Sequence, residues 1–131
     1  MLINYSDHIN KLNDFREGKI QEALKLDHKE IDSSFRFVSG NMNFILGHNN
    51  VGKTHFTFYL MLLYSLKHNI RWLVFSSEND PVQLIKKLIE FIEGKPINKI
   101  EEKDYEQSKE FVYNHFKFVD INRQYTYKQL L

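Results

Sequence analysis

The stretch that decides the fold of this 131-residue chain is Gly47-His48-Asn49-Asn50-Val51-Gly52-Lys53-Thr54. It matches the phosphate-binding loop pattern G-x-x-x-x-G-K-[ST] at every required position. The two glycines let the backbone turn tightly against a ligand, and successive backbone N–H groups of such a loop form a nest for phosphate oxygens. Lys53 is expected to bind the β- and γ-phosphates, and Thr54 to offer its hydroxyl to Mg²⁺. The pattern predicts that all eight residues form a nucleotide site.

The sequence on either side predicts a strand, the loop and a helix, in that order. Residues 42–46 form a short apolar-rich run that ends at Gly47, which is typical of a buried strand. Residues 53–69 contain no glycine or proline and are apolar from Phe58 to Tyr64, which predicts a helix. The dipole of this helix adds to the anion site. The alternative is a glycine turn between a strand and a core helix, with Lys53 merely in solvent.

Strands and helices alternate along most of the chain. Strands separated by helices predict an α/β fold with a parallel sheet flanked by helices, in which ligands bind at the carboxyl ends of the strands. We expect a partly helical lead-in segment over residues 1–34 and a nucleotide-binding core over residues 35–131. The predicted elements besides those above are a helix in 9–26 broken near Gly18, strands at 35–38, 71–77 and 117–121, a helix from Asp80-Pro81 to Gly94, and a helix at 101–116.

Glu78 is a further candidate for a chemical role, outside the loop. It follows the predicted strand 71–77, at the same edge of the sheet as Gly47. A carboxylate at that edge can orient or deprotonate a water that attacks the γ-phosphate. The alternative is that Glu78 begins the next helix and complements its dipole.

Composition restricts the function classes only modestly. Lys and Arg number 18 and Asp and Glu 17, so the net charge of +1 gives no argument for DNA or membrane binding by itself. Cysteine is absent, which excludes disulfides and thiolate metal sites. The six histidines have no convincing metal spacing. A group of lysines predicts a solvated surface rather than a nucleic-acid track: Lys86, Lys87, Lys95, Lys99 and Lys103.

The loop 47–54, together with Leu73-Val74-Phe75-Ser76-Ser77-Glu78-Asn79, resembles the ATPase core of hexameric replicative DNA helicases. These are the DnaB- and Twinkle-like proteins of the RecA-like P-loop superfamily, and the resemblance covers residues 18–131. It implies a RecA-like fold, ATP and Mg²⁺ as cofactors, and Glu78 and Lys53 as catalytic residues. It also implies single-stranded DNA as a partner and a homo-oligomeric ring in the intact protein. The longest apolar run, from Phe58 to Tyr64, is far below the roughly 20 residues that span a bilayer, so no membrane association is expected. The absence of cysteine fits the expected cytoplasmic location.

The chain also departs from that family. An apolar strand ending in a magnesium-associated aspartate, the DNA-binding loops and an arginine finger are not visible in the sequence. Asp120, after Phe118 and Val119, is the one candidate for the aspartate, and a strand-end cap or turn is its alternative role. Thr126 is expected to cap a helix that has hardly begun, so we expect the N-terminal part of a longer motor domain. The alternatives are a RecA-like recombinase or clock-type ATPase, and a non-catalytic nucleotide-binding or interaction module.

Overall fold

The computed structural model describes residues 4–19 and 23–120, and these fall into two compact units, 1–43 and 44–131. The boundary follows Asn43, whereas the sequence suggested one after Ser34. The reason is an isolated antiparallel bridge between Leu24 and Phe37, which ties residues 35–38 to the first unit. The elements in chain order are η1 (Tyr5–His8), α1 (Ile9–Arg16), α2 (Lys29–Ser34), α3 (Lys53–His68), β1 (Trp72–Val74), α4 (Pro81–Glu93), η2 (Ile97–Lys99), α5 (Glu102–His115) and β2 (Phe116–Phe118).

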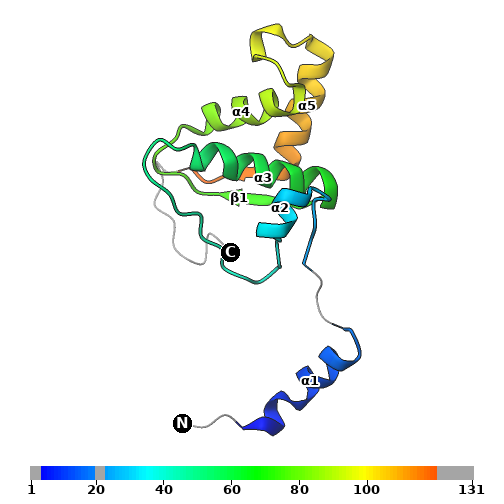
Figure 1. The fold of residues 1–131 in the computed structure, drawn as a ribbon. Helices are drawn as coiled ribbons and strands as arrows, with labels where there is room; N and C mark the ends of the chain where they lie inside the picture. Colours follow the sequence, from blue (N-terminus) through cyan, green and yellow to red (C-terminus); the bar gives the residue numbers. More distant parts are fainter. Residues whose placement is uncertain (1–3, 20–22, 121–131) are drawn as a thin grey trace. The chain divides into compact units, whose positions relative to one another are not determined.

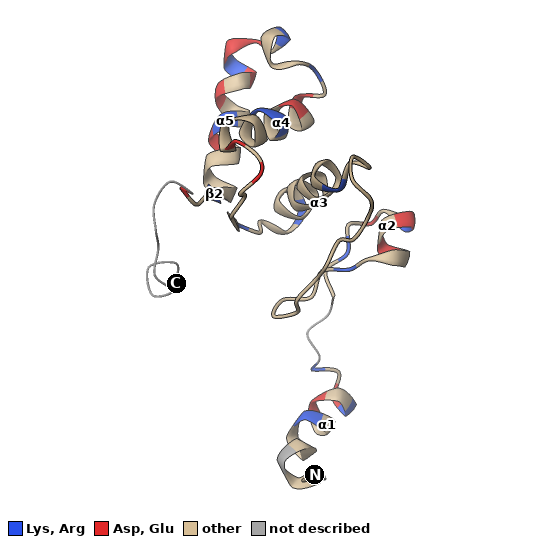
Figure 2. Cartoon of the chain, turned by 90° about the vertical axis from the view of Figure 1, so that its left-hand side faces the viewer, with Lys and Arg blue, Asp and Glu red and all other residues tan. Residues whose placement is uncertain are grey.

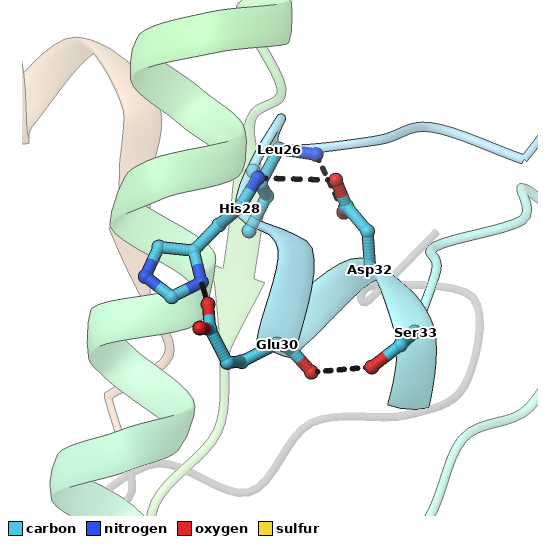
Figure 3. A network of polar contacts seen from close by, with 5 residues as sticks. All are labelled: Leu26, His28, Glu30, Asp32 and Ser33. Atoms are coloured by element: carbon cyan, nitrogen blue, oxygen red, sulfur yellow. Dashed lines mark hydrogen bonds and ion pairs between the residues drawn. The ribbon is translucent and has the colours of Figure 1, made fainter.

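The first unit contains α1 and the short helix α2, whose start is held by a carboxylate from within the helix. Asp32 accepts hydrogen bonds from the backbone N–H groups of Leu26, at 2.8 Å, and His28, at 3.1 Å (Figure 3). The Ser33 hydroxyl donates to the Glu30 carbonyl at 3.0 Å. The two Asp32 contacts tie the segment that leads into α2 to the second turn of the helix. The predicted break near Gly18 is confirmed, since α1 ends at Arg16 and Gly18 has a φ of 69°.

The second unit is an α/β arrangement in which β1 and β2 pair in parallel, with Trp72 opposite Phe116. Helix α4 packs on α3 and on α5, and Figure 1 shows α3 alongside β1. Side chains alternate along both strands: Val74 and Phe116 are buried, whereas Leu73 and Lys117 are exposed. One face of this small sheet therefore carries the helices, and the parallel pairing expected from the alternating elements is confirmed.

The core of the second unit is built from the apolar stripes of all three helices and from the inward side chains of both strands. Its buried members are Phe58, Leu62, Val74, Leu84, Leu88, Ile89, Val112 and Phe116. Helix α4 begins at Pro81, and the Asp80 carboxylate accepts from the Val82 N–H at 2.9 Å, as the Asp-Pro pair predicts. It ends at Gly94, whose φ of 65° gives the left-handed C-cap. Within the described residues, no helix combines the length and the apolar character needed to cross a membrane.

The predicted strand over residues 42–46 is wrong. These residues adopt no regular structure, and Phe44 and Leu46 are 72% and 89% exposed. A strand needs a neighbour for its backbone groups, and the sheet of the described residues consists of β1 and β2 alone. Two other predicted strands are shorter than expected. The predicted strand 71–77 pairs only at Trp72–Val74, and the predicted strand 35–38 contributes a single bridge. The last strand begins at Phe116, and Ile121 and Thr126 lie outside the described residues.

Candidate functional site

The loop 47–54 leads directly into α3 and turns sharply at its end. Gly52 is the N-cap residue of α3 and has a φ of 85°, in the left-handed region where glycine pays no steric penalty. Its carbonyl accepts the first helical hydrogen bond, from the Phe56 N–H at 2.9 Å. Asn50 is also left-handed, with a φ of 59°. These two left-handed residues reverse the chain, so that the loop curls back over the start of α3.

Lys53 closes the loop from inside. Its ammonium group donates to the carbonyl of Gly47 at 2.8 Å and to that of His48 at 2.5 Å. Gly47 leaves the room for this, because a Cβ there would lie 3.2 Å from Val51 Cγ2 and 3.3 Å from Lys53 Cδ. The half-buried Lys53 side chain is thus fixed at the mouth of the loop, where a cation faces the cleft described below.

The opposite wall is the segment that leaves the carboxyl end of β1. Residues 76–79 turn there before α4 begins, and the Ser76 hydroxyl accepts from the Asn79 N–H at 3.2 Å. Strand β1 is fastened to α3 through Trp72, whose indole N–H donates to Ser65 Oγ at 2.9 Å and to the Met61 carbonyl at 3.1 Å. The wall that carries Glu78 is therefore held against the same helix that carries the loop.

Between these walls lie two adjoining hollows of about 340 and 500 Å³. Both are lined by Lys53, Thr54, Glu78 and Asn79. The smaller hollow continues along Val74 to Ser77, and the larger one passes under Asn49, Asn50 and Gly52. A hydroxyl, an ammonium group and a carboxylate from two separate elements thus converge on one cleft.

The structure places most of the predicted site residues at this cleft. Five residues of the loop line the larger hollow: Asn49, Asn50, Gly52, Lys53 and Thr54. Gly47 and His48 provide the carbonyls that hold Lys53, whereas Val51 lines a separate apolar hollow with Phe56, Tyr59 and Phe91. Glu78 is exposed and precedes α4, whose N-cap is Asp80. Asp120 is exposed, follows the end of β2 and lines neither hollow of the cleft.

Two residues at the cleft were not identified from the sequence. Lys87, on α4, lines the larger hollow and is half-buried, although its sequence context predicted a solvated lysine. His55 lines the same hollow, and its ring meets Phe91 edge-on at 4.6 Å between centroids. The signal for Lys87 lies in the register of α4, because Lys87 is one turn from both Leu84 and Phe91, which face the core. Lys87 therefore flanks the packed face of the helix.

The described residues offer few protein ligands for a metal ion at the cleft. No cluster of three His, Asp or Glu side chains that could hold a metal occurs in residues 4–19 and 23–120. Mg²⁺ in phosphate sites keeps several waters and takes one or two protein oxygens plus phosphate oxygens. The Thr54 hydroxyl lies on the larger hollow and is an oxygen of this kind. Comparisons of the chain with protein-family models, with curated proteins and with solved structures find no match.

Proposed function

We propose that the cleft between the loop 47–54 and residues 76–79 binds the phosphate chain of ATP together with Mg²⁺. The observation that carries this proposal is the convergence of Lys53, Thr54 and Glu78 on both hollows. The amino end of α3 lies at the loop, and its unpaired N–H groups and dipole favour an anion there. The volume of the larger hollow, about 500 Å³, is in the range of small-molecule sites.

In this proposal each side chain has one task. Lys53 exchanges its bonds to the carbonyls of Gly47 and His48 for bonds to phosphate oxygens, which are stronger because both partners carry charge. Thr54 places its hydroxyl where it can hold Mg²⁺, and the ion, when bound, neutralises charge on the β- and γ-oxygens. Glu78 accepts a hydrogen bond from a water and turns it toward the γ-phosphate, a role that its exposure to the cleft allows.

We further propose that this cleft is the ATP-binding core of a replicative DNA helicase of RecA-like fold. The support is the resemblance of residues 47–54 and 73–79 to that family, together with a parallel pair of strands and a carboxylate beyond the end of β1. In the intact protein, hydrolysis would drive movement along single-stranded DNA in a homo-oligomeric ring.

The test is calorimetric titration of the chain with Mg-ATP, using Lys53→Ala and the control Lys103→Ala. Lys103 is exposed in the first turn of α5 and lines neither hollow of the cleft. A hydrogen bond to a charged group contributes about 1.5–3 kcal/mol, so Lys53→Ala should weaken binding by roughly 10-fold to 150-fold. Lys103→Ala should bind as the parent does. Failure of the folded parent chain to bind Mg-ATP, or equal affinity of parent and Lys53→Ala, would overturn the proposal.

A further inference from the structure

Lys87 is the lysine of α4 that lines the cleft. It lines the 500 Å³ hollow together with Asn49, Asn50 and Glu78, and its side chain is half-buried. One turn further along α4, the Phe91 ring contacts His55 at 4.6 Å and Tyr59 at 5.5 Å between centroids. The Lys87 backbone is thus fixed on the α3-facing side of α4, and its long side chain can lie along the packed surface with the ammonium group in the cleft.

The neighbouring lysine differs in its surroundings. Lys86 pairs with Glu90 at 3.9 Å, an ordinary contact one turn along the helix, and lines neither hollow of the cleft. Among the residues that the structure describes, Lys87 makes no ion pair, and Glu78 on the same hollow makes none either. An ammonium group at a cleft that has no acidic partner attracts an anion more strongly than one that is already paired. The position of Lys87 therefore favours an anion in the cleft.

We propose that Lys87 is a second phosphate-binding cation of this cleft and makes it selective for longer phosphate chains. This inference rests on the proposed binding of a nucleotide polyphosphate. Lys53 and Lys87 line the same hollow from different elements, one from the loop and one from α4. Lys53 is tied to the loop through the carbonyls of Gly47 and His48, so it serves the phosphate nearest the loop. A second cation contributes only to a ligand whose phosphates extend beyond that point.

The direction of the selectivity follows from charge. Each added phosphoryl group brings further negative charge and further acceptor oxygens into a hollow that contains two lysines and one carboxylate. Lys87 should therefore increase affinity most for ATP and inorganic tripolyphosphate, less for ADP, and least for AMP. The contribution should decrease with added salt, because the hollow is open to solvent and its charges are screened.

The experiment compares the parent chain with Lys87→Met and the matched control Lys86→Met, with ATP, ADP, AMP and tripolyphosphate as ligands in calorimetric titrations. Methionine keeps the aliphatic length and removes the charge. Lys87→Met should lose about tenfold or more in affinity for ATP and tripolyphosphate and much less for AMP. Lys86→Met should match the parent for all four ligands. Circular dichroism melting of each variant checks that the fold is kept.

The outcomes separate this inference from the proposed function. Absence of binding by the parent chain refutes the proposed function and the inference with it. Binding by the parent with an unchanged ATP-to-AMP affinity ratio in Lys87→Met refutes only the role of Lys87. An equal loss in Lys86→Met also refutes it, because the effect would then come from the general charge of α4. Loss confined to ATP, ADP and AMP, with tripolyphosphate unaffected, would show that Lys87 acts on the nucleoside instead.

Discussion

Two glycines of the loop perform different tasks, and substitution by alanine separates them. At Gly52 a Cβ meets nothing within 4 Å, so the whole cost of Gly52→Ala comes from its φ of 85°. A left-handed conformation costs a non-glycine residue about 1–2 kcal/mol. At Gly47 the φ is not in that region, and the cost comes from contact with Val51 Cγ2 at 3.2 Å and Lys53 Cδ at 3.3 Å. Both are flexible side chains that can move by a few tenths of an ångström.

The two substitutions should therefore affect different measurements. Gly52→Ala should lower the free energy of unfolding by about 1–2 kcal/mol. For a domain of the size of the second unit, each kcal/mol lowers Tm by about 4–8 °C. Gly47→Ala should leave Tm nearly unchanged, yet weaken Mg-ATP binding, because the added Cβ pushes the Lys53 side chain away from the position at which it would meet the phosphate oxygens. Thermal melts and calorimetric titrations of both variants check this. Equal Tm values for Gly52→Ala and the parent, or unchanged affinity in Gly47→Ala, would refute the reasoning.

Two further predictions concern catalysis and the core. In the intact protein, Glu78→Gln should keep Mg-ATP binding but lose about 10² or more of the ATP hydrolysis rate, because the amide cannot accept a proton from the attacking water. The matched control Glu110→Gln, at an exposed position, should hydrolyse ATP as the parent does. Phosphate release assays measure both, and near-parental turnover in Glu78→Gln would remove that residue from the mechanism. Leu88→Ala, at a position that is 0% exposed, should cost about 2–5 kcal/mol in urea unfolding. Val82→Ala, on the same helix but 66% exposed, should stay within about 0.5 kcal/mol of the parent, and similar losses in the two variants would contradict the assigned core.

The helices of the second unit could be predicted from the sequence because their signals are local. The Asp80-Pro81 start, the Gly94 end and the apolar stripe through Leu88 and Ile89 all act within one or two turns. The charges of the helices are also visible in the sequence: Figure 2 shows α3 largely uncharged and α5 carrying charges of both signs. Tyr105, Val112 and Phe116 fall on the packed side of their segment.

The strand over residues 42–46 could not be predicted in the same way, because a strand depends on partners distant in the sequence. An apolar run such as Phe44 to Leu46 predicts burial only when a neighbouring strand is present to pair with it. Ile45 alone from this run reaches the wall of the smaller hollow. The start of β2 was also predicted imperfectly, because the strand begins at Phe116, one residue earlier than expected. Lys117 therefore lies on the exposed face of the sheet.

The site was partly predictable for a related reason. The loop 47–54 is contiguous in sequence, so its pattern indicates its geometry, including the left-handed Gly52. Glu78 could be predicted from the rule that ligands bind beyond the carboxyl ends of parallel strands. Lys87 and His55 depend on how α4 packs on α3, and no local pattern reports that packing. The register of α4 places Lys87 beside the packed face of the helix, but only the long-range packing of α4 on α3 brings Lys87 and His55 to the cleft.

The most direct test of the central claim is an ¹⁵N NMR titration of the chain with Mg-ATP, because it reports where the ligand binds. The account predicts saturable shifts of the backbone amide resonances of residues 47–54 and 76–79, and at Lys87 on α4, with little change in α1 and α2 of the first unit. The apolar hollow at Tyr59 and Phe91 provides an internal comparison. Saturable shifts confined to residues away from the loop, or no shifts at millimolar Mg-ATP in the folded chain, would contradict the assignment of this cleft as a nucleotide site.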